Sequence, residues 1–293
     1  MDVVYGKDAV EYEVAFESQD EAMMVVCGGE VDGQSVETVL AALDEMGIGV
    51  AGVVCADSGI DRWRDLVAHP QDGGEEGWRL GRLGVLGVVG DMDSAVSGKE
   101  VGEESVWIEM KEQDTTDVMK TLRVVSAPLV FGFGLGGSRM DHVLASLTAL
   151  AGCSHPNVVF CYGSDIVFRL PCPRLELTDL PPNTRVSLYP LGTVAGLSST
   201  GLKWPLDDLV FHPSRLIGTS NVLLPTFTSF SITTSPSTSP STSASTTTTS
   251  ANEGRDPMLV ILPRTIPVLR SLITFLLFPP TSISTASTTN QRS

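Results

Sequence analysis

The chain has 293 residues, 42% of them hydrophobic, which is enough for two domains with sizeable cores. Its formal net charge of −16 argues against nucleic acid and anionic membranes as partners, because binding to either needs a basic surface. The N-terminus lacks the apolar core of a signal peptide, and no run reaches the roughly 18–20 apolar residues of a membrane span, so we expect a soluble cytoplasmic protein.

Residues 1–22 are expected to form an N-terminal extension. From residue 23 to 162, short Val-rich runs bounded by Gly, Asp or Pro alternate with amphipathic segments, which predicts buried strands between helices. The predicted strands are 23–27, 50–55, 84–89, 106–109, 128–133 and 158–161. This alternation is typical of an α/β domain with a Rossmann-like, mostly parallel sheet and helices on both faces. Ligands of such sheets bind beyond the carboxyl ends of the strands.

Three helices are predicted between these strands. Ser35 is the expected N-cap of the first, and Gly47 ends it. The second spans residues 115–125 and has Asp114 as its expected cap. The third spans residues 139–151 and ends before Gly152. Its expected buried face consists of Met140, Val143, Leu144, Leu147 and Leu150.

The pattern changes at residue 163, after which turn signals separate short β-like runs as far as about residue 220. This predicts a smaller all-β sandwich domain over residues 163–264, with a strand at 258–262. An insertion at 233–252 interrupts it. Of the 18 residues from 233 to 250, 15 are Ser or Thr, which predicts disorder because the segment has almost no apolar surface to bury. Residues 265–293 are expected to be a disordered tail.

The segment Gly90-Asp91-Met92-Asp93-Ser94 follows a predicted buried strand. Strand alternation would place Asp91 and Asp93 on one side at its carboxyl end, where carboxylate oxygens suit Mg²⁺. An Asp-rich turn closed by a side-chain hydrogen bond is the alternative interpretation, and for this motif alone it is the commoner one.

The segment Gln113-Asp114-Thr115-Thr116-Asp117 opens the second predicted helix. A helix N-terminus attracts phosphate, and Asp117 would face a ligand held there. A cap and a favourable acidic charge in the first turn explain the same residues without a ligand.

A glycine-rich turn at 132–137 leads into the third helix and is followed by Arg139, Asp141 and His142. Glycines let backbone N–H groups approach phosphate, and Arg139 adds a cation. The turn has neither the Lys-Ser/Thr of a Walker loop nor the spacing of a dinucleotide fingerprint. Taken alone it is weak evidence, since Asp141 could be a first-turn acid and His142 an ordinary surface or core residue.

In the β domain, Ser198–Leu206 contains Trp204 among several hydroxyl groups, and Ser220-Asn221 follows. An exposed Trp could stack on a flat heteroaromatic ligand, with a further gain if the ring is cationic. A core Trp in a small sandwich is the commoner case.

Taken in order, the motifs resemble those of the thiamine pyrophosphokinase family over roughly residues 23–262. That family carries Ala-Asp-Gly-Gly, Gly-Asp-x-Asp-Ser, Gln-Asp-x-Thr-Asp, Gly-Gly-Arg-x-Asp-His, Thr-Thr-Gly-Leu-Lys-Trp and Ser-Asn elements. Here they read Ala56-Asp57-Ser58-Gly59, Gly90–Ser94, Gln113–Asp117, Gly136–His142, Ser199–Trp204 and Ser220-Asn221. Each element alone is weak, but the ordered set is highly specific.

The resemblance implies transfer of a pyrophosphoryl group from ATP to thiamine with release of AMP, by a homodimer whose site lies between subunits. It implies that Asp91, Asp93 and Asp117 are the catalytic carboxylates that bind Mg²⁺. The residues implied to bind ATP and its phosphates are Asp57, Gln113, Thr116, Arg139 and Asp141. The residues implied to bind thiamine are Trp204, Ser220, Ser199 and Thr200.

The chain departs from the family pattern at Ser58, where Gly is usual, at the extra Ser138 before Arg139, and at Val118, where an aromatic residue is usual. The Ser/Thr insertion falls where the family has a short hairpin. Two other functions are weighed: a metal-dependent nucleotide-sugar glycosyltransferase, which also uses Asp-x-Asp, and a non-catalytic relative that binds thiamine or nucleotide. The glycosyltransferase does not account for Gln113–Asp117 or Ser199–Trp204.

Overall fold

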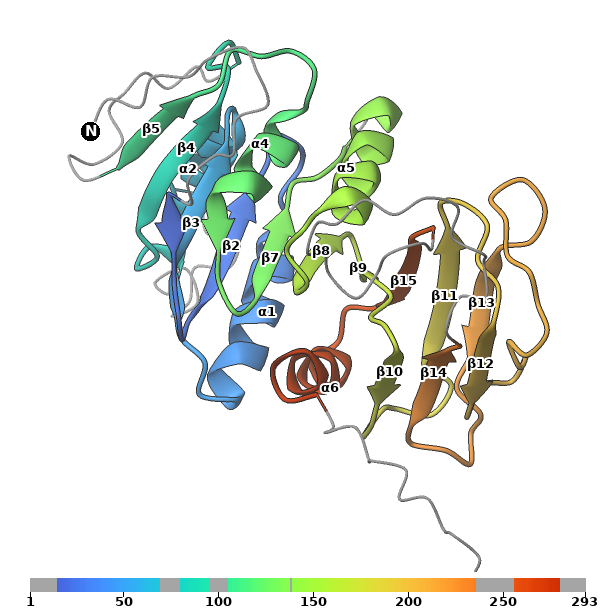
Figure 1. Cartoon of the computed structure of the whole chain (residues 1–293). Coiled ribbons are helices and arrows are strands. Elements are labelled where there is room, and N and C mark those ends of the chain that lie inside the picture. The colour runs from blue at the N-terminus through green and yellow to red at the C-terminus, as the bar shows by residue number, and fades with distance from the viewer. Residues whose placement is uncertain (1–14, 69–79, 95–104, 138, 236–255, 280–293) are drawn as a thin grey trace, which may run out of the picture.

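The computed structural model describes residues 15–68, 80–94, 105–137, 139–235 and 256–279. Its centre is a ten-stranded sheet with the order β13-β11-β15-β9-β8-β7-β2-β3-β4-β5 (Figure 1). Six neighbouring strands are parallel: β2 (Ala22–Val26), β3 (Val50–Ala56), β4 (Val85–Gly90), β5 (Val106–Glu109), β7 (Val130–Phe133) and β8 (Val158–Tyr162). The prediction of a mostly parallel α/β sheet is therefore confirmed.

The β-rich half extends the same sheet rather than forming a separate one. Its antiparallel strands are β9 (Asp165–Arg169), β15 (Met258–Pro263), β11 (Arg185–Pro190) and β13 (Gly218–Val222). A second sheet of β10 (Arg174–Leu177), β14 (Phe230–Thr234) and β12 (Leu197–Thr200) completes the predicted sandwich. The change from parallel to antiparallel pairing occurs at Gly163, in the turn between β8 and β9.

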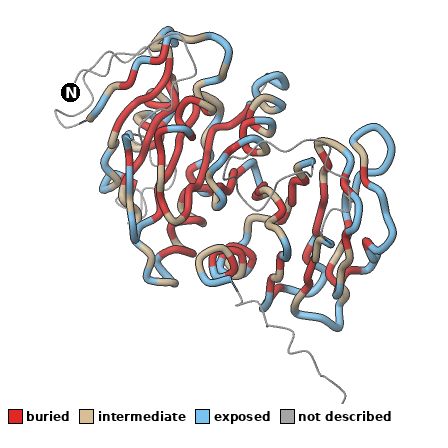
Figure 2. Tube along the Cα trace, viewed as in Figure 1, coloured by how far each residue is buried: buried red, intermediate tan, exposed pale blue. Residues whose placement is uncertain are grey.

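Helices cover both faces of the parallel part (Figure 1), and each face has its own core. The strands of this part are mostly buried (Figure 2). One core contains side chains of α1 (Gly33–Glu45), α2 (Gly59–Ala68) and α6 (Ile266–Leu277), and it continues into the sandwich. The other contains side chains of α4 (Asp117–Val124) and α5 (Met140–Gly152). On this second side, β1 (Phe16–Glu17) pairs in parallel with β6 (Val125–Ser126).

Two predicted helix caps are wrong. Asp32, not Ser35, caps α1: its carboxylate accepts from Gln34 N, and Ser35 Oγ donates to it instead. The N-cap of α4 is Thr116, while the N–H of Asp114 donates to the carboxylate of Glu112. In α1 a nearby acid is the better-placed acceptor, whereas α4 begins at Asp117, two residues later than predicted.

The predicted buried face of α5 is also wrong in part, because Met140 is 67% and Leu144 57% exposed. The helix instead turns the small residues Ser146 and Ala149 inward, where Ser146 Oγ donates to the carbonyl of Leu135. Helical periodicity located the helix but not the side that faces the sheet.

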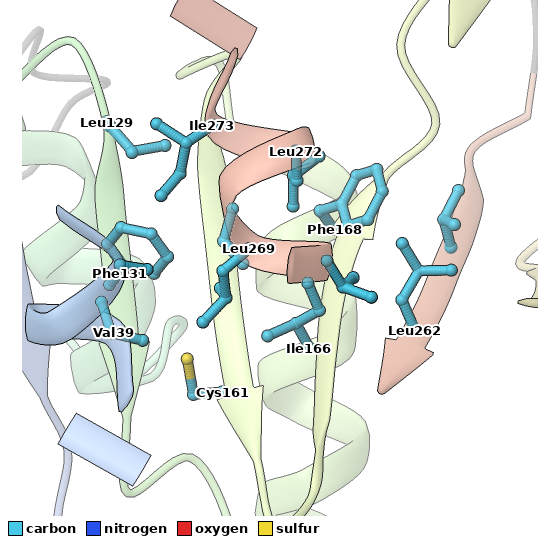
Figure 3. Close-up of a cluster of buried hydrophobic side chains, with 14 of the residues drawn as sticks. Val39, Leu129, Phe131, Cys161, Ile166, Phe168, Leu262, Leu269, Leu272 and Ile273 are labelled. Atoms are coloured by element: carbon cyan, nitrogen blue, oxygen red, sulfur yellow. The ribbon is translucent and has the colours of Figure 1, made fainter. Parts of the chain in front are cut away.

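The prediction that residues 265–293 form a disordered tail is wrong for 266–277, which form α6. This helix lies between α1 and β10 (Figure 1), and Leu269, Leu272 and Ile273 are fully buried in the cluster that Figure 3 shows. The insertion predicted at 233–252 begins too early, because Thr233 and Thr234 belong to β14. The rest of the insertion and residues 280–293 lie outside the described residues.

Cys27, Cys55 and Cys161 are buried free thiols. Among the described residues, no helix is both long and apolar enough to cross a membrane.

Candidate active site

The predicted site residues of the α/β half gather at the carboxyl edge of its parallel sheet. Asp57 follows β3, the Asp91–Asp93 pair follows β4, and Asp117 begins α4. Gly90 lets them approach, since a Cβ there would lie 2.8 Å from Asp57 Cβ and 3.0 Å from Asp117 Oδ1. Any larger residue at position 90 would push these two carboxylates apart.

Carboxylate oxygens of Asp57, Asp91 and Asp93 lie within 4.8 Å of one another, close enough to hold one metal ion. Asp91 and Asp93 converge through a turn, not through the predicted strand alternation: β4 ends at Gly90, and Met92 has a φ of 63°. The N–H of Asp93 donates to Asp91 Oδ1 at 3.3 Å, so the turn hydrogen bond and the carboxylate cluster occur together.

Asp57 is the buried member of this cluster, with only 1% of its surface exposed. Its Oδ2 accepts from the N–H of Ser94 at 3.1 Å, whereas Oδ1 has no hydrogen-bond partner among the residues that the structure describes. Burial raises the pKa of Asp57, and the nearby carboxylates, Asp117 foremost, raise it further. A buried anionic oxygen without a partner is costly, which fits a cation ligand at this point.

We therefore expect Asp57→Asn to raise the melting temperature at pH 7 in EDTA by about 2 °C or more. The raised pKa means that ionised Asp57 destabilises the folded state at neutral pH, and an amide removes that charge. The gain should shrink as the pH falls and vanish below the ordinary Asp pKa of about 4, where the carboxyl is protonated in both states. Differential scanning calorimetry at pH 7 and pH 5 measures it, with exposed Asp20→Asn as the control. A lower melting temperature at pH 7 would contradict this account.

Asp91 is tied to α4 and to the loop before it. Gln113 Nε2 donates to Asp91 Oδ2 at 2.7 Å, and Lys120 Nζ lies 3.7 Å from the same oxygen. Burial alone would raise the pKa of Asp91, but the hydrogen bonds from Gln113 and Asp93 and the charge of Lys120 lower it below its ordinary value. Asp91 is therefore held as an anion.

Asp117 faces the Asp91–Asp93 pair, because Lys120 lies between them. Lys120 Nζ donates to Asp117 Oδ1 at 3.1 Å, so one ammonium bridges Asp117 and Asp91. Thr116, the N-cap of α4, makes no side-chain cap hydrogen bond. Asp117 therefore lies beside the metal-binding group through Lys120, but the three carboxylates within reach of one ion are Asp57, Asp91 and Asp93, so Asp57 takes the place predicted for Asp117.

Two glycine turns lie against each other beside this cluster. The N–H of Gly29, in the turn after β2, donates to the carbonyl of Gly134 at 2.9 Å, and that of Glu30 donates to Gly136 at 3.2 Å. A methyl group on Gly29 would collide with the Gly136 carbonyl, and Gly134 has a left-handed φ of 65°. Glycine is required at both positions for the turns to meet.

Arg139 and Asp141 form an exposed ion pair at the N-terminus of α5. Arg139 Nη2 donates to Asp141 Oδ2 at 2.6 Å and Nε donates to Oδ1 at 3.2 Å. The guanidinium is 67% exposed, so it can exchange this partner for an anionic ligand at little desolvation cost.

The predicted thiamine-side residues form a separate group in the sandwich. Trp204 is 53% exposed, so the core interpretation of this residue is wrong. Its backbone is fixed on both sides by buried Asn221, whose Oδ1 accepts from Trp204 N at 3.2 Å and whose Nδ2 donates to Trp204 O at 2.7 Å. Lys203 Nζ lies 4.6 Å from the Trp204 ring centroid, so one face of the ring already interacts with a cation.

The hydroxyl residues of this group have structural partners. Ser199 Oγ accepts from the N–H of Leu206, and Thr200 Oγ1 bonds Ser231 Oγ. Ser220 has a left-handed φ of 61°, and its N–H donates to Ser187 Oγ. Seven strands separate β13, which carries Asn221, from β4, so one chain does not bring Trp204 to the carboxylates.

Several residues of the site were missed from the sequence. The Gly28-Gly29 turn follows a buried strand, a signal equal to that of the predicted Gly132–Gly137 turn. Glu112 accepts hydrogen bonds from the N–H groups of Asp114 and Thr115. No motif or spacing in the sequence predicts these bonds. Lys120 was missed because a lysine on a helix is usually exposed. Its burial results from the packing of α4 against the neighbouring strands, which helical periodicity does not reveal.

Two family models match the chain. One is described as thiamin pyrophosphokinase, catalytic domain, and matches residues 50–162; the other as thiamin pyrophosphokinase, vitamin B1 binding domain, and matches residues 175–236. Together they cover more than half of the sequence.

Curated relatives and solved structures agree with these models. Thiamine pyrophosphokinase 3 of Oryza sativa subsp. japonica is 25% identical over 202 residues, which cover 61% of this chain and 74% of that protein. The thiamin pyrophosphokinase of Candida albicans superposes with a TM-score of 0.57 at 14% identity, covering 87% of this chain and 94% of that one. The yeast enzyme also gives 0.57 at 14% identity, covering 93% and 97%. At this identity the structures show the fold alone.

Proposed function

This chain belongs to the thiamin pyrophosphokinase family, and we propose that it transfers the pyrophosphoryl group of Mg-ATP to the hydroxyl of thiamine, giving thiamine diphosphate and AMP. The observation that carries the proposal is the cluster of Asp57, Asp91 and Asp93 at the carboxyl edge of the sheet. Hard oxygen ligands at this edge suit a metal-bound triphosphate.

The residues fit Mg²⁺ as the ion of this site. Three carboxylates offer oxygens within 4.8 Å of one another, and Asp57 Oδ1 is buried with no partner among the described residues. Asp57, Asp91 and Asp93 would hold the ion, with Asp117 beside them. When bound, Mg²⁺ supplies positive charge that offsets the charge of the triphosphate.

The remaining residues would bind and orient the nucleotide. Gln113 fixes Asp91, and Arg139 is free to turn from Asp141 toward a phosphate oxygen. Attack by the thiamine hydroxyl on the β-phosphorus, in line with departing AMP, then requires positioning and charge stabilisation rather than a covalent intermediate.

Thiamine would be supplied to this site by the sandwich of a second copy. The exposed face of Trp204 suits stacking on a cationic heteroaromatic ring, but it lies on the half of the chain opposite to the carboxylates. A homodimer with its sites between the subunits brings the two halves together, because a two-fold axis creates the contact twice.

Trp204→Ala should raise the thiamine KM about tenfold while changing the ATP KM little, since loss of one stacking and cation–π contact removes on the order of 1–2 kcal/mol. Mixed with Asp91→Asn chains at low thiamine, it should regain about one quarter of wild-type activity. A dimer of one chain of each kind has one intact site. Exposed Phe227→Ala is the control, and absence of any regain would show that both residues act within one chain.

Release of AMP from ATP and Mg²⁺, with and without thiamine, tests the proposed reaction. AMP release should depend on thiamine, and UDP-sugars should not be hydrolysed. Thiamine binding by calorimetry without AMP release would instead support the non-catalytic relative, and UDP-sugar hydrolysis the glycosyltransferase.

A further inference from the structure

Lys120 is a buried cation in the carboxylate cluster. Only 1% of its side chain is exposed, although it lies on a helix that begins at the edge of the site. Its Nζ lies 3.1 Å from Asp117 Oδ1 and 3.7 Å from Asp91 Oδ2. An ammonium is rarely buried without carboxylate partners, because removing it from water costs several kcal/mol.

The charges around Lys120 are unequal. Asp57, Asp91, Asp93 and Asp117 place up to four negative charges in one cluster, against one buried ammonium. Without Lys120 the cluster would be a strong divalent-cation site in its own right, since like charges at this range are relieved by any cation. With Lys120 present, two of the four carboxylates already have a cationic partner.

We propose that Lys120 is a positioning residue that acts as a built-in counter-ion, so that the cluster binds a divalent ion weakly by itself and retains it only together with phosphate oxygens. This inference rests on the proposed function, because weak metal binding is useful only where the ion arrives with ATP and leaves with the products. The positioning role follows from the geometry, because the same ammonium holds Asp117 of α4 close to Asp91 in the turn after β4.

Lys120→Met tests this through metal binding in the absence of nucleotide and thiamine. Electron paramagnetic resonance of Mn²⁺ should give a dissociation constant about tenfold lower for the variant than for wild type, because a like charge next to the bound ion is removed. The rise in melting temperature on adding Mg²⁺ should also be larger in the variant. AMP release should fall through kcat, with little change in the thiamine KM.

Lys111→Met is the matched control, because Lys111 lies in the same half of the chain with 78% of its side chain exposed. Its loss should leave Mn²⁺ affinity unchanged, since solvent screens it. Lys120→Gln keeps a hydrogen-bond donor and removes only the charge, so it should tighten Mn²⁺ binding as Lys120→Met does.

Unchanged or weaker Mn²⁺ binding in folded Lys120→Gln would overturn the inference and leave Lys120 a structural residue. The measurement uses neither substrate. Tighter Mn²⁺ binding in a protein that releases no AMP would therefore refute the proposed function but not the role of Lys120.

Discussion

Asp91→Asn is expected to lower thiamine-dependent AMP release on the order of 1,000-fold, the scale on which loss of one preorganised charge-stabilising group acts. Asp91 has the most contacts in the cluster, because it accepts a hydrogen bond from Gln113 and its carboxylate lies close to Lys120. The amide keeps the shape of the side chain but not its charge. The turn should survive, because the amide oxygen can still accept from the N–H of Asp93.

Steady-state kinetics with circular dichroism of the same samples measure this effect separately from folding. Exposed Asp20→Asn, which removes one negative charge far from the cluster, should retain full activity. Asp91→Asn activity within tenfold of wild type, at unchanged Mg²⁺ dependence, would contradict a role for Asp91 as metal ligand.

Truncation after Arg264 is expected to prevent folding, because it removes α6. Five of its side chains, Val268, Leu269, Leu272, Ile273 and Phe275, are buried in the core shared by both halves. Figure 3 shows three of them, Leu269, Leu272 and Ile273. At about 2 kcal/mol each they contribute about 10 kcal/mol, which is comparable to the whole stability of a typical domain. Truncation after Pro279 keeps α6 and should fold normally.

Single substitutions give the same test without truncation. Leu272→Ala should lower the free energy of unfolding by about 2–5 kcal/mol, since it leaves a cavity in a closed core. Thr274→Ala, on the exposed side of the same helix, should change it by no more than about 0.5 kcal/mol. Urea denaturation measures both. Equal effects of the two variants would mean that α6 does not pack as described.

The strands of the α/β half could be predicted from the sequence because buried parallel strands are continuous apolar runs with sharp ends. Val106–Glu109, for example, was predicted with both of its observed bounds. Helix α6 was missed because Pro267 and Arg270 interrupt its apolar pattern and Arg264 precedes it. Pro267 lies in the first turn, where proline is tolerated, and Arg270 points outward to Glu45. The spacing of Val268, Leu269, Leu272 and Ile273 was the signal available.

The site residues that belong to sequence motifs could be predicted, and those whose role depends on how the elements pack could not. Asp57, Asp91 and Gln113 were identified through their motifs. The bridge made by Lys120 depends on how α4 lies against β3 and β4, which no local pattern encodes. The turn at Met92, which brings Asp93 back toward Asp91, similarly depends on a left-handed backbone that a non-glycine residue seldom adopts.

The most direct test of the proposed reaction follows the β-phosphate of ATP. With [β-³²P]ATP, Mg²⁺ and thiamine, the label should appear in thiamine diphosphate, and unlabelled AMP should form in equal amount. Label that appears in ADP would indicate transfer of the γ-phosphoryl group alone, and label that remains in ATP while thiamine binds would indicate no transfer. Either result would contradict pyrophosphoryl transfer by this chain.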